Sequence, residues 1–339
     1  MSSTTLTPLL QAAFDARTEL LARLHGEATD AYRLFHGSVE GEAGLTIDRY
    51  GSLLLVQTFH SSLSPAQLDE IEDFYEHASP GLAMVYNDRS GANSRIGNPL
   101  PEDELEAAML PREFQELGVS YHVQARHGGQ DPWLFLDMRA GRRRVMQEAE
   151  GKSVLNLFAY TCGIGIAAAK AGASHVVNVD FAESSLRVGK QNARLNNLPI
   201  RPRFVQSDVF PAVRQLSGLG QPTMVRGKRM PPFPKLEAKQ FDLVFLDPPR
   251  YAKSLFGVVD LVNDYSSVFK PALLATAEGG TLICCNNVAQ VDADAWLDLL
   301  QRSAAKAGRT VREVEWITPE SDFPSHDGKH PLKMVLLRV

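Results

Sequence analysis

A segment of the chain combines glycines and polar residues in a way that suits the binding of an adenosine-containing cofactor. The run Asn156-Leu157-Phe158-Ala159-Tyr160-Thr161-Cys162-Gly163-Ile164-Gly165 follows an apolar stretch, and its glycines would let the backbone approach a ligand where a helix begins. Asp180 ends a second apolar stretch, where its carboxylate could accept both hydroxyl protons of a ribose. Asp208 ends a third, where it could meet the edge of an adenine.

Asp247-Pro248-Pro249 ends a fourth apolar stretch and indicates a different chemistry. Rigid prolines can hold backbone carbonyls and a carboxylate against a flat acceptor base. Gly163-x-Gly165-x-x-Ala168 also fits the loose dinucleotide fingerprint, but a nicotinamide enzyme has no need of a proline pair here. Taken singly, the glycines could serve a tight turn, and Asp180 or Asp208 could cap a helix. The ordered set favours methyl transfer over hydride transfer.

Such residues meet only if successive strands end at one edge of a sheet. From residue 151 onward, strand-like runs alternate with helical ones, and the strands are expected at 152–160, 175–180, 202–208, 241–249 and 279–287. This alternation predicts a doubly wound, Rossmann-like α/β domain with a parallel sheet, in which ligands bind at the carboxyl ends of the strands. We place this domain at 121–339. Before its first α/β strand we expect a hairpin that includes residues 134–139, followed by a basic helix.

A smaller α+β domain is predicted at 1–120. Leucines at helical spacing predict one amphipathic helix over 7–25, and 65–78 returns to a helical period. Two strands are expected around a turn at Arg49-Tyr50-Gly51, with a further strand at 81–88.

Composition excludes several classes of protein. The 339 residues are 44% hydrophobic and 22% charged, no apolar run approaches the roughly 20 residues that span a bilayer, and no signal peptide is evident. Three cysteines without a CxxC pair predict neither a disulfide framework nor a zinc site, so we expect a cytoplasmic protein without metal. Residues 1–124 hold 19 acidic and 7 basic residues, a charge of −12, whereas 125–339 hold 28 basic and 21 acidic residues, a charge of +7. A polyanion would therefore meet the second part.

The segment 217–240 interrupts the α/β rhythm and is too long for a minimal connection. We interpret it as an insertion that could contact phosphates through its basic residues, or alternatively as a solvated loop. Those residues are Arg226, Lys228, Arg229, Lys235 and Lys239.

The sequence resembles the class I 23S rRNA methyltransferases, a family that includes cytosine-C5 enzymes and the guanine-N7 half of a bifunctional enzyme. The resemblance covers about residues 30–339. Its motifs are Arg33-Leu34, Gly44-Leu45-Thr46-Ile47-Asp48-Arg49-Tyr50, Leu134-Phe135-Leu136-Asp137-Met138-Arg139, Asn156-Leu157-Phe158-Ala159-Tyr160-Thr161 and Leu246-Asp247-Pro248-Pro249. Many members carry an N-terminal PUA domain that binds RNA; this sequence starts too late to contain one, so RNA docking is expected on the basic part.

The resemblance implies an enzyme that uses S-adenosyl-L-methionine and acts on RNA, with 23S rRNA as the expected substrate. It implies a set of cofactor-binding residues: Phe158, Ala159, Tyr160, Thr161, Gly163, Gly165, Asp180, Asp208, Val209 and Asp247. The catalytic residues expected are Asp247, Pro248, Pro249 and Asn287. Those expected to bind the substrate are Arg250, Tyr251, Asn286, Asp137 and Arg139.

The fifth strand bears on the methylated base. Cytosine-C5 members place a nucleophilic cysteine seven residues beyond a Gly-Gly pair, and counting from Gly279-Gly280 that position is Asn287. The run resembles the guanine-N7 form, which has Asn-Asn there. Cys284 and Cys285 lie inside the apolar strand, where a small buried hydrophobe is the ordinary interpretation. We therefore expect methylation of guanine N7, with cytosine C5 as the alternative.

Two functions of other classes remain open from the sequence alone. One is an NAD-dependent oxidoreductase, and the other is a non-catalytic RNA-binding factor that keeps the cofactor fold. The sequence does not decide whether the chain forms a homodimer.

Overall fold

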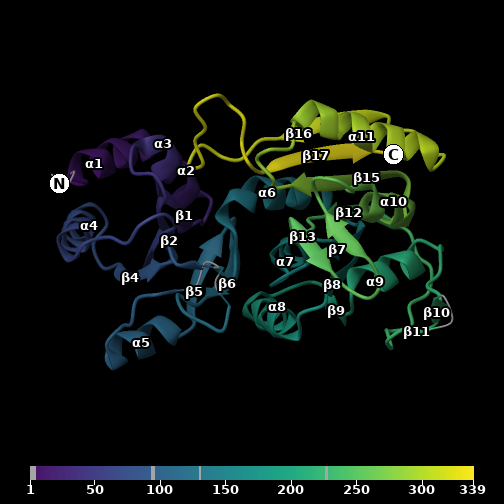
Figure 1. Ribbon diagram of the computed structural model, residues 1–339, viewed down its shortest axis with the longest axis horizontal. Helices are drawn as coiled ribbons and strands as arrows, with labels where there is room; N and C mark the ends of the chain where they lie inside the picture. Colours follow the sequence, from purple (N-terminus) through teal and green to yellow (C-terminus); the bar gives the residue numbers. More distant parts are fainter. Residues whose placement is uncertain (1–4, 93–95, 130, 226–227) are drawn as a thin grey trace. The chain divides into compact units, whose positions relative to one another are not determined.

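The computed structural model describes residues 5–92, 96–129, 131–225 and 228–339. The chain forms two compact units (Figure 1): residues 1–137 with 320–329 make the first, and residues 138–319 with 330–339 make the second. The boundary predicted at 120/121 differs from this division, because the first unit continues to Asp137 and includes a segment from the C-terminal part of the chain. In the described residues, no helix has the length and apolarity required to cross a membrane.

The first unit is built on a four-stranded sheet with the order β1-β2-β3-β4, antiparallel except for the parallel pair β3–β4. Its strands are β1 (Ala31–His36), β2 (Leu45–Tyr50), β3 (Leu53–Thr58) and β4 (Ala83–Asp88). A separate hairpin pairs β5 (Arg112–Glu116) with β6 (Val119–Val123). The helices are α1 (Thr7–Ala16), α2 (Thr18–Gly26), α3 (Gly37–Glu40), α4 (Pro65–Ala78) and α5 (Glu102–Met109).

The single helix predicted over 7–25 is two helices that meet at Arg17. The guanidinium of Arg17 is buried and donates hydrogen bonds to the carbonyl oxygens of Ala13 and Arg33 and to the carboxylate of Glu40. A buried charge needs such partners, and they hold Arg17 at the junction. Helix α4 begins as its sequence predicts, because Ser64 and Gln67 form a capping box around Pro65.

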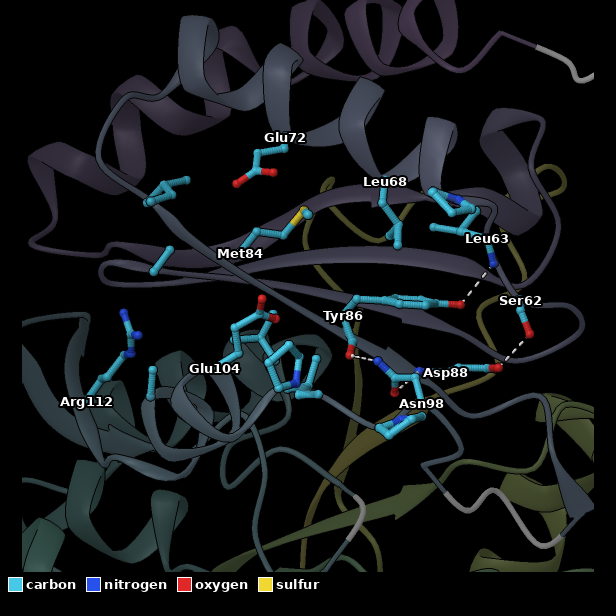
Figure 2. A pocket seen from close by; sticks show the side chains of 18 residues that line it. Ser62, Leu63, Leu68, Glu72, Met84, Tyr86, Asp88, Asn98, Glu104 and Arg112 are labelled. Atoms are coloured by element: carbon cyan, nitrogen blue, oxygen red, sulfur yellow. Dashed lines mark hydrogen bonds between the residues drawn. The ribbon is translucent and has the colours of Figure 1, made fainter.

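The open edge of β4 is covered at its carboxyl end by the segment that follows it (Figure 2). Asn98 donates to the carbonyl oxygen of Tyr86 at 2.8 Å and accepts from the backbone N–H of Asp88 at 3.3 Å, while Ser62 donates to the Asp88 carboxylate at 2.6 Å. Covering an edge in this way prevents it from pairing with another chain. A groove of about 770 Å³ lies along the same strand, lined by apolar side chains such as Leu68 and Met84.

The second unit contains a seven-stranded sheet with the order β16-β17-β15-β12-β7-β8-β9 (Figure 1). Five strands are parallel, and β17 and β16 add antiparallel strands at one side. The strands are β7 (Ser153–Leu157), β8 (His175–Asp180), β9 (Arg203–Gln206), β12 (Phe241–Leu246), β15 (Thr276–Asn286), β16 (Glu313–Ile317) and β17 (Lys333–Arg338). The strand order reverses between β7 and β12, which confirms the predicted doubly wound, Rossmann-like fold.

Helices pack on both faces of this sheet because its strands are apolar on both sides. Helices α9 (Val209–Leu216), α10 (Ser266–Ala275) and α11 (Ala293–Lys306) pack in one core with residues such as Leu157 and Leu246. Helices α6 (Arg139–Glu148) and α7 (Gly163–Lys170) pack in the other with residues such as Val154 and Phe245. Helix α8 (Glu183–Leu195) follows β8 and contacts α7.

Two predicted connections differ from the structure. The hairpin expected around 134–139 is absent there: a short 3-10 helix (Leu136–Met138) leads directly into α6. The alternating burial of Leu134, Phe135 and Leu136 resembles a strand but occurs without a sheet partner. The insertion 217–240 contains a short hairpin of β10 (Met224–Val225) and β11 (Lys228–Arg229). A further hairpin, β13 (Tyr251–Lys253) with β14 (Val258–Asp260), follows the Asp-Pro-Pro motif.

Candidate active site

The loop that follows β7 has an unusual backbone. Phe158, Tyr160 and Cys162 have φ values of 58°, 48° and 64°, in the left-handed region that normally favours glycine. Each such residue costs on the order of 1–3 kcal/mol, and such strain is concentrated at ligand-binding and active sites. The loop is held by hydrogen bonds from Ala159 N–H to the Val179 carbonyl oxygen at 3.0 Å and from Cys162 N–H to the Ala159 carbonyl oxygen at 2.7 Å. Thr161 is buried within it.

Asp180 fixes this loop from the neighbouring strand. At the end of β8, one carboxylate oxygen accepts the N–H of Tyr160 at 2.9 Å and the other accepts the N–H of Ala182 at 2.8 Å. Burial raises the pKa of Asp180, and these two N–H groups oppose the rise. The side chain is 6% exposed. Asp180 therefore holds an acceptor group at the carboxyl edge of the sheet, directly beside the strained loop.

The two glycines predicted to bind cofactor lie at the start of α7, which begins at Gly163 after an N-cap at Cys162. A Cβ on Gly165 would lie 2.0 Å from Oδ1 of Asn178, whose side chain accepts a hydrogen bond from Asn156 at 2.9 Å. Gly165 is therefore required for the close packing of α7 on β8, whatever it contributes to a ligand.

Asp208 has the capping role that a single carboxylate after a strand suggests. It is the N-cap of α9, and its Oδ1 accepts the N–H of Phe210 at 2.9 Å. Val209, at the first helical position, is 5% exposed. The cap fixes the Asp208 carboxylate at the same edge of the sheet as Asp180, because β9 runs parallel to β8.

The Asp-Pro-Pro motif lies at this edge too. Leu246 is in register with Leu157 of β7 and with Cys284 of β15, so Asp247 follows at the level of Phe158. Asp247 is half-buried, as is Pro249, while Pro248 is buried. Beyond the motif, Arg250 is exposed and donates to Oε1 of Gln290 at 3.4 Å, and Tyr251 is 61% exposed at the start of β13.

The two asparagines at the end of β15 have different environments. Asn286 is fully buried; its Nδ2 donates to the Leu261 carbonyl oxygen at 3.3 Å, and its Oδ1 accepts the N–H of Val288 at 3.0 Å. Asn287 is exposed. The fold thus uses the Asn286 side chain to tie the base of the β13–β14 hairpin to β15, and Asn287 presents its side chain to solvent.

The remaining predicted residues fall elsewhere. Asp137 is the last residue of the first unit, and Arg139 opens α6 in the second with a fully buried side chain. In the insertion, Arg229, Lys235 and Lys239 are exposed. Arg226 lies outside the described residues, as does the side chain of Lys228.

Phe181 was not among the predicted site residues. It follows Asp180 directly and is 66% exposed at the carboxyl edge of the sheet. A large aromatic side chain left in solvent beside a buried carboxylate is unusual, and it offers a flat face for an adenine. The signal in the sequence was the phenylalanine immediately after the acidic end of the second strand.

A model of the S-adenosylmethionine-dependent methyltransferase family matches residues 78–338. The chain belongs to this family. It is therefore an enzyme whose cofactor is S-adenosyl-L-methionine. Over 302 residues it is 28% identical to ribosomal RNA large subunit methyltransferase I of Escherichia coli O139:H28, which covers 88% of this chain and 71% of that protein.

Solved structures agree on the fold. A methyltransferase crystallised in complex with SAH matches with a TM-score of 0.78 at 24% identity, over 99% of this chain and 81% of that one. A SAM-dependent methyltransferase from Streptococcus mutans matches with a TM-score of 0.76 at 25% identity, over the same shares of the two chains.

Proposed function

We propose that this methyltransferase acts on a base of large-subunit ribosomal RNA, and that the acceptor is guanine N7. The RNA substrate is supported by the name of the relatives and by the charge of +7 on residues 125–339, which suits a polyanion. That name does not state the base. The choice of base therefore rests on the cysteines and on the end of β15.

The cofactor would be held at the carboxyl edge of the second unit's sheet. Asp180 would accept the ribose hydroxyls, Phe181 would cover one face of the adenine, and Asp208 would meet its edge. The strained loop 158–162 and the start of α7 would face the amino-acid part of the cofactor. These residues fit the group because a buried carboxylate, an exposed aromatic ring and a close backbone turn lie on adjacent strand ends.

The burial of every cysteine carries the base assignment. The chain has three cysteines, and Cys162, Cys284 and Cys285 are each 0% exposed. Burial raises the pKa of the thiols of Cys162 and Cys284, so neither is a ready thiolate. Methylation at cytosine C5 needs a thiolate that attacks C6 of the base. The position that would supply it holds Asn287.

Guanine N7 requires less of the protein. When bound, S-adenosylmethionine supplies an electrophilic methyl group on a sulfonium centre. The N7 lone pair would form a bond to the methyl carbon as the carbon–sulfur bond breaks, so no covalent enzyme intermediate and no proton transfer are needed. The residues of the site would act by aligning the base, and alignment can supply a large share of a rate enhancement.

Four residues could align the base. Asp247 and the exposed Asn287 end neighbouring strands and would hydrogen-bond the edge of a base that has left its stack. Tyr251 is exposed beside them and would stack on that base, while Arg250 would hold a phosphate.

The direct test uses ribosomal RNA from a strain that lacks this protein. Purified enzyme and labelled S-adenosylmethionine are added, and the nucleosides are separated by mass spectrometry. Labelled 7-methylguanosine is the expected product. Labelled 5-methylcytidine would refute the base assignment and turn attention to Cys284 and Cys285. Cofactor binding without label in any RNA would refute the RNA substrate.

A pair of variants separates alignment from covalent catalysis. Asn287→Ala should lower kcat about tenfold, the value of one lost hydrogen bond to the base in the transition state. Cys284→Ala, which removes a buried thiol next to it in the fold's core, should leave kcat within about twofold. Full activity of Asn287→Ala on the true substrate would remove Asn287 from the site.

A further inference from the structure

A second basic site lies at the opposite edge of the same sheet. A cavity of about 510 Å³ opens where β8, β9 and β12 begin, and none of its lining residues belongs to the candidate active site. The lining includes His175, Arg203, Leu216, Lys235, Lys239 and Phe241. These strands are parallel, so their amino ends are separated from the catalytic edge by the length of a strand, roughly 20 Å.

The fold positions the two lysines of this cavity. Three hydrogen bonds tie the end of the insertion to α9: Gln215 Nε2 to the Pro234 carbonyl oxygen at 3.0 Å, Leu236 N–H to Gln215 Oε1 at 3.2 Å, and Lys239 N–H to the Leu216 carbonyl oxygen at 2.9 Å. Residues 234–239 are thus docked on the second unit.

Aromatic rings support the cations. The Nζ of Lys235 lies 4.8 Å from the centre of the Phe233 ring, and that of Lys239 lies 5.4 Å from the centre of the buried Phe241 ring. The His175 ring stacks on Phe241, with 6.4 Å between centres and an interplanar angle of 15°. Such contacts keep amino groups near one place without neutralising them, because no charge is transferred to the ring.

His175 reports the sign of the local potential. Burial lowers its pKa, and the charges of Lys239 and Arg203 lower it further. Glu237 is the acidic residue in the lining, and it faces three cations, from Arg203 of β9 and Lys235 and Lys239 of the insertion. The cavity is therefore a positive hollow with an excess of cationic side chains.

We propose that this cavity binds phosphodiester groups of the RNA substrate, away from the base that is methylated. The proposal rests on the proposed function, because the ligand is the backbone of that RNA. Lys235, Lys239 and Arg203 supply charge and hydrogen-bond donors for phosphate oxygens, and Phe241 lies beneath them. The site anchors a part of the RNA that lies beyond the reach of the catalytic residues, so it contributes to RNA affinity and not to the chemical step.

The first test compares two double variants with equal loss of charge. Lys235→Ala with Lys239→Ala removes two cations from the cavity, whereas Arg302→Ala with Lys306→Ala removes two exposed cations from α11. The first should weaken binding of ribosomal RNA roughly tenfold. It should also lower the slope of log K against log salt by about 2, one for each phosphate contact.

Kinetics locate the effect. In the Lys235→Ala, Lys239→Ala variant, KM for RNA should rise while kcat at saturating RNA and the Kd for S-adenosylmethionine stay unchanged. The α11 variant should match the wild type in all of these. Equal losses in both double variants, or an unchanged RNA affinity in the cavity variant, would overturn the proposal.

The second test observes His175 itself by NMR titration, with its signal assigned from His175→Gln. A single-stranded RNA oligonucleotide should raise the pKa of His175, because phosphate charge offsets Lys239 and Arg203. A rise with inorganic phosphate at the same ionic strength but not with RNA would overturn the proposal in favour of a free-anion site, and no rise with either would overturn it outright. A rise with RNA in an enzyme that labels no ribosomal RNA would refute the proposed function and leave this cavity as an RNA site.

Discussion

Asp180→Asn offers a sharp test of how the cofactor loop is held. The aspartate accepts two backbone N–H groups, those of Tyr160 and Ala182, with one oxygen each. An asparagine of the same shape presents one oxygen and one NH₂ group, so one of the two N–H groups would face another donor. Losing a charge-assisted bond and leaving a buried donor unpaired costs about 2–3 kcal/mol of folding free energy.

The cofactor affinity should change as well. If the carboxylate also accepts the ribose hydroxyls, replacing it by a neutral amide weakens those bonds by roughly 1.4 kcal/mol, a tenfold rise in Kd. Calorimetric titration with S-adenosylmethionine measures the affinity, and urea unfolding of the cofactor-free protein measures the stability.

Asp208→Asn is the matched control, because asparagine caps helices as well as aspartate does. Its folding free energy should stay within about 0.5 kcal/mol of the wild type. The reasoning fails if Asp180→Asn is as stable as Asp208→Asn, or if it binds the cofactor with wild-type affinity.

Two further predictions concern stability. Gly165→Ala should cost about 3 kcal/mol in urea unfolding, because its Cβ would overlap Asn178, whereas Gly26→Ala, with open space around it, should be neutral. Partial burial acts to raise the pKa of Glu148, but hydrogen bonds from Arg338 and Lys152 lower it from 4.5 to about 2. Stability from Glu148 is thus present above pH 4.5 and lost as pH falls toward 2, about 1–3 kcal/mol after solvent screening. Glu148→Gln should reduce the difference between unfolding at pH 7 and pH 3; an unchanged difference would contradict this.

The sequence predicted the second unit's sheet and the strand ends that carry Asp180, Asp208 and Asp247. It could do so because a buried parallel strand is an apolar run, and the residue after that run lies at the ligand edge whatever the details of packing. The break at Arg17 could not be predicted in this way. It depends on partners distant in the chain, such as Glu40, and no glycine or proline marks it.

The strain in the cofactor loop was also outside the reach of pattern reasoning. Phe158, Tyr160 and Cys162 are residue types that seldom adopt positive φ, so propensity argues against the conformation they have. Only the surrounding bonds, including the one from Tyr160 N–H to Asp180, make it stable. The Gly165–Asn178 contact is hidden for a similar reason, since a glycine at a helix start suggests a ligand before it suggests a neighbouring side chain.

A parallel sheet has two chemically different edges, and this chain uses them differently. At the carboxyl edge, Asp180, Asp208 and Asp247 are acidic and lie beside backbone N–H groups, which suits a cofactor that carries a positive sulfonium and hydroxyl groups. At the amino edge, Arg203, Lys235 and Lys239 surround a hollow that suits phosphate. If RNA contacts both edges, a substitution at the amino edge changes how much RNA is bound, while one at the carboxyl edge changes how fast the bound base is methylated. The proposed KM and kcat measurements separate these two effects because the strands themselves keep the sites apart.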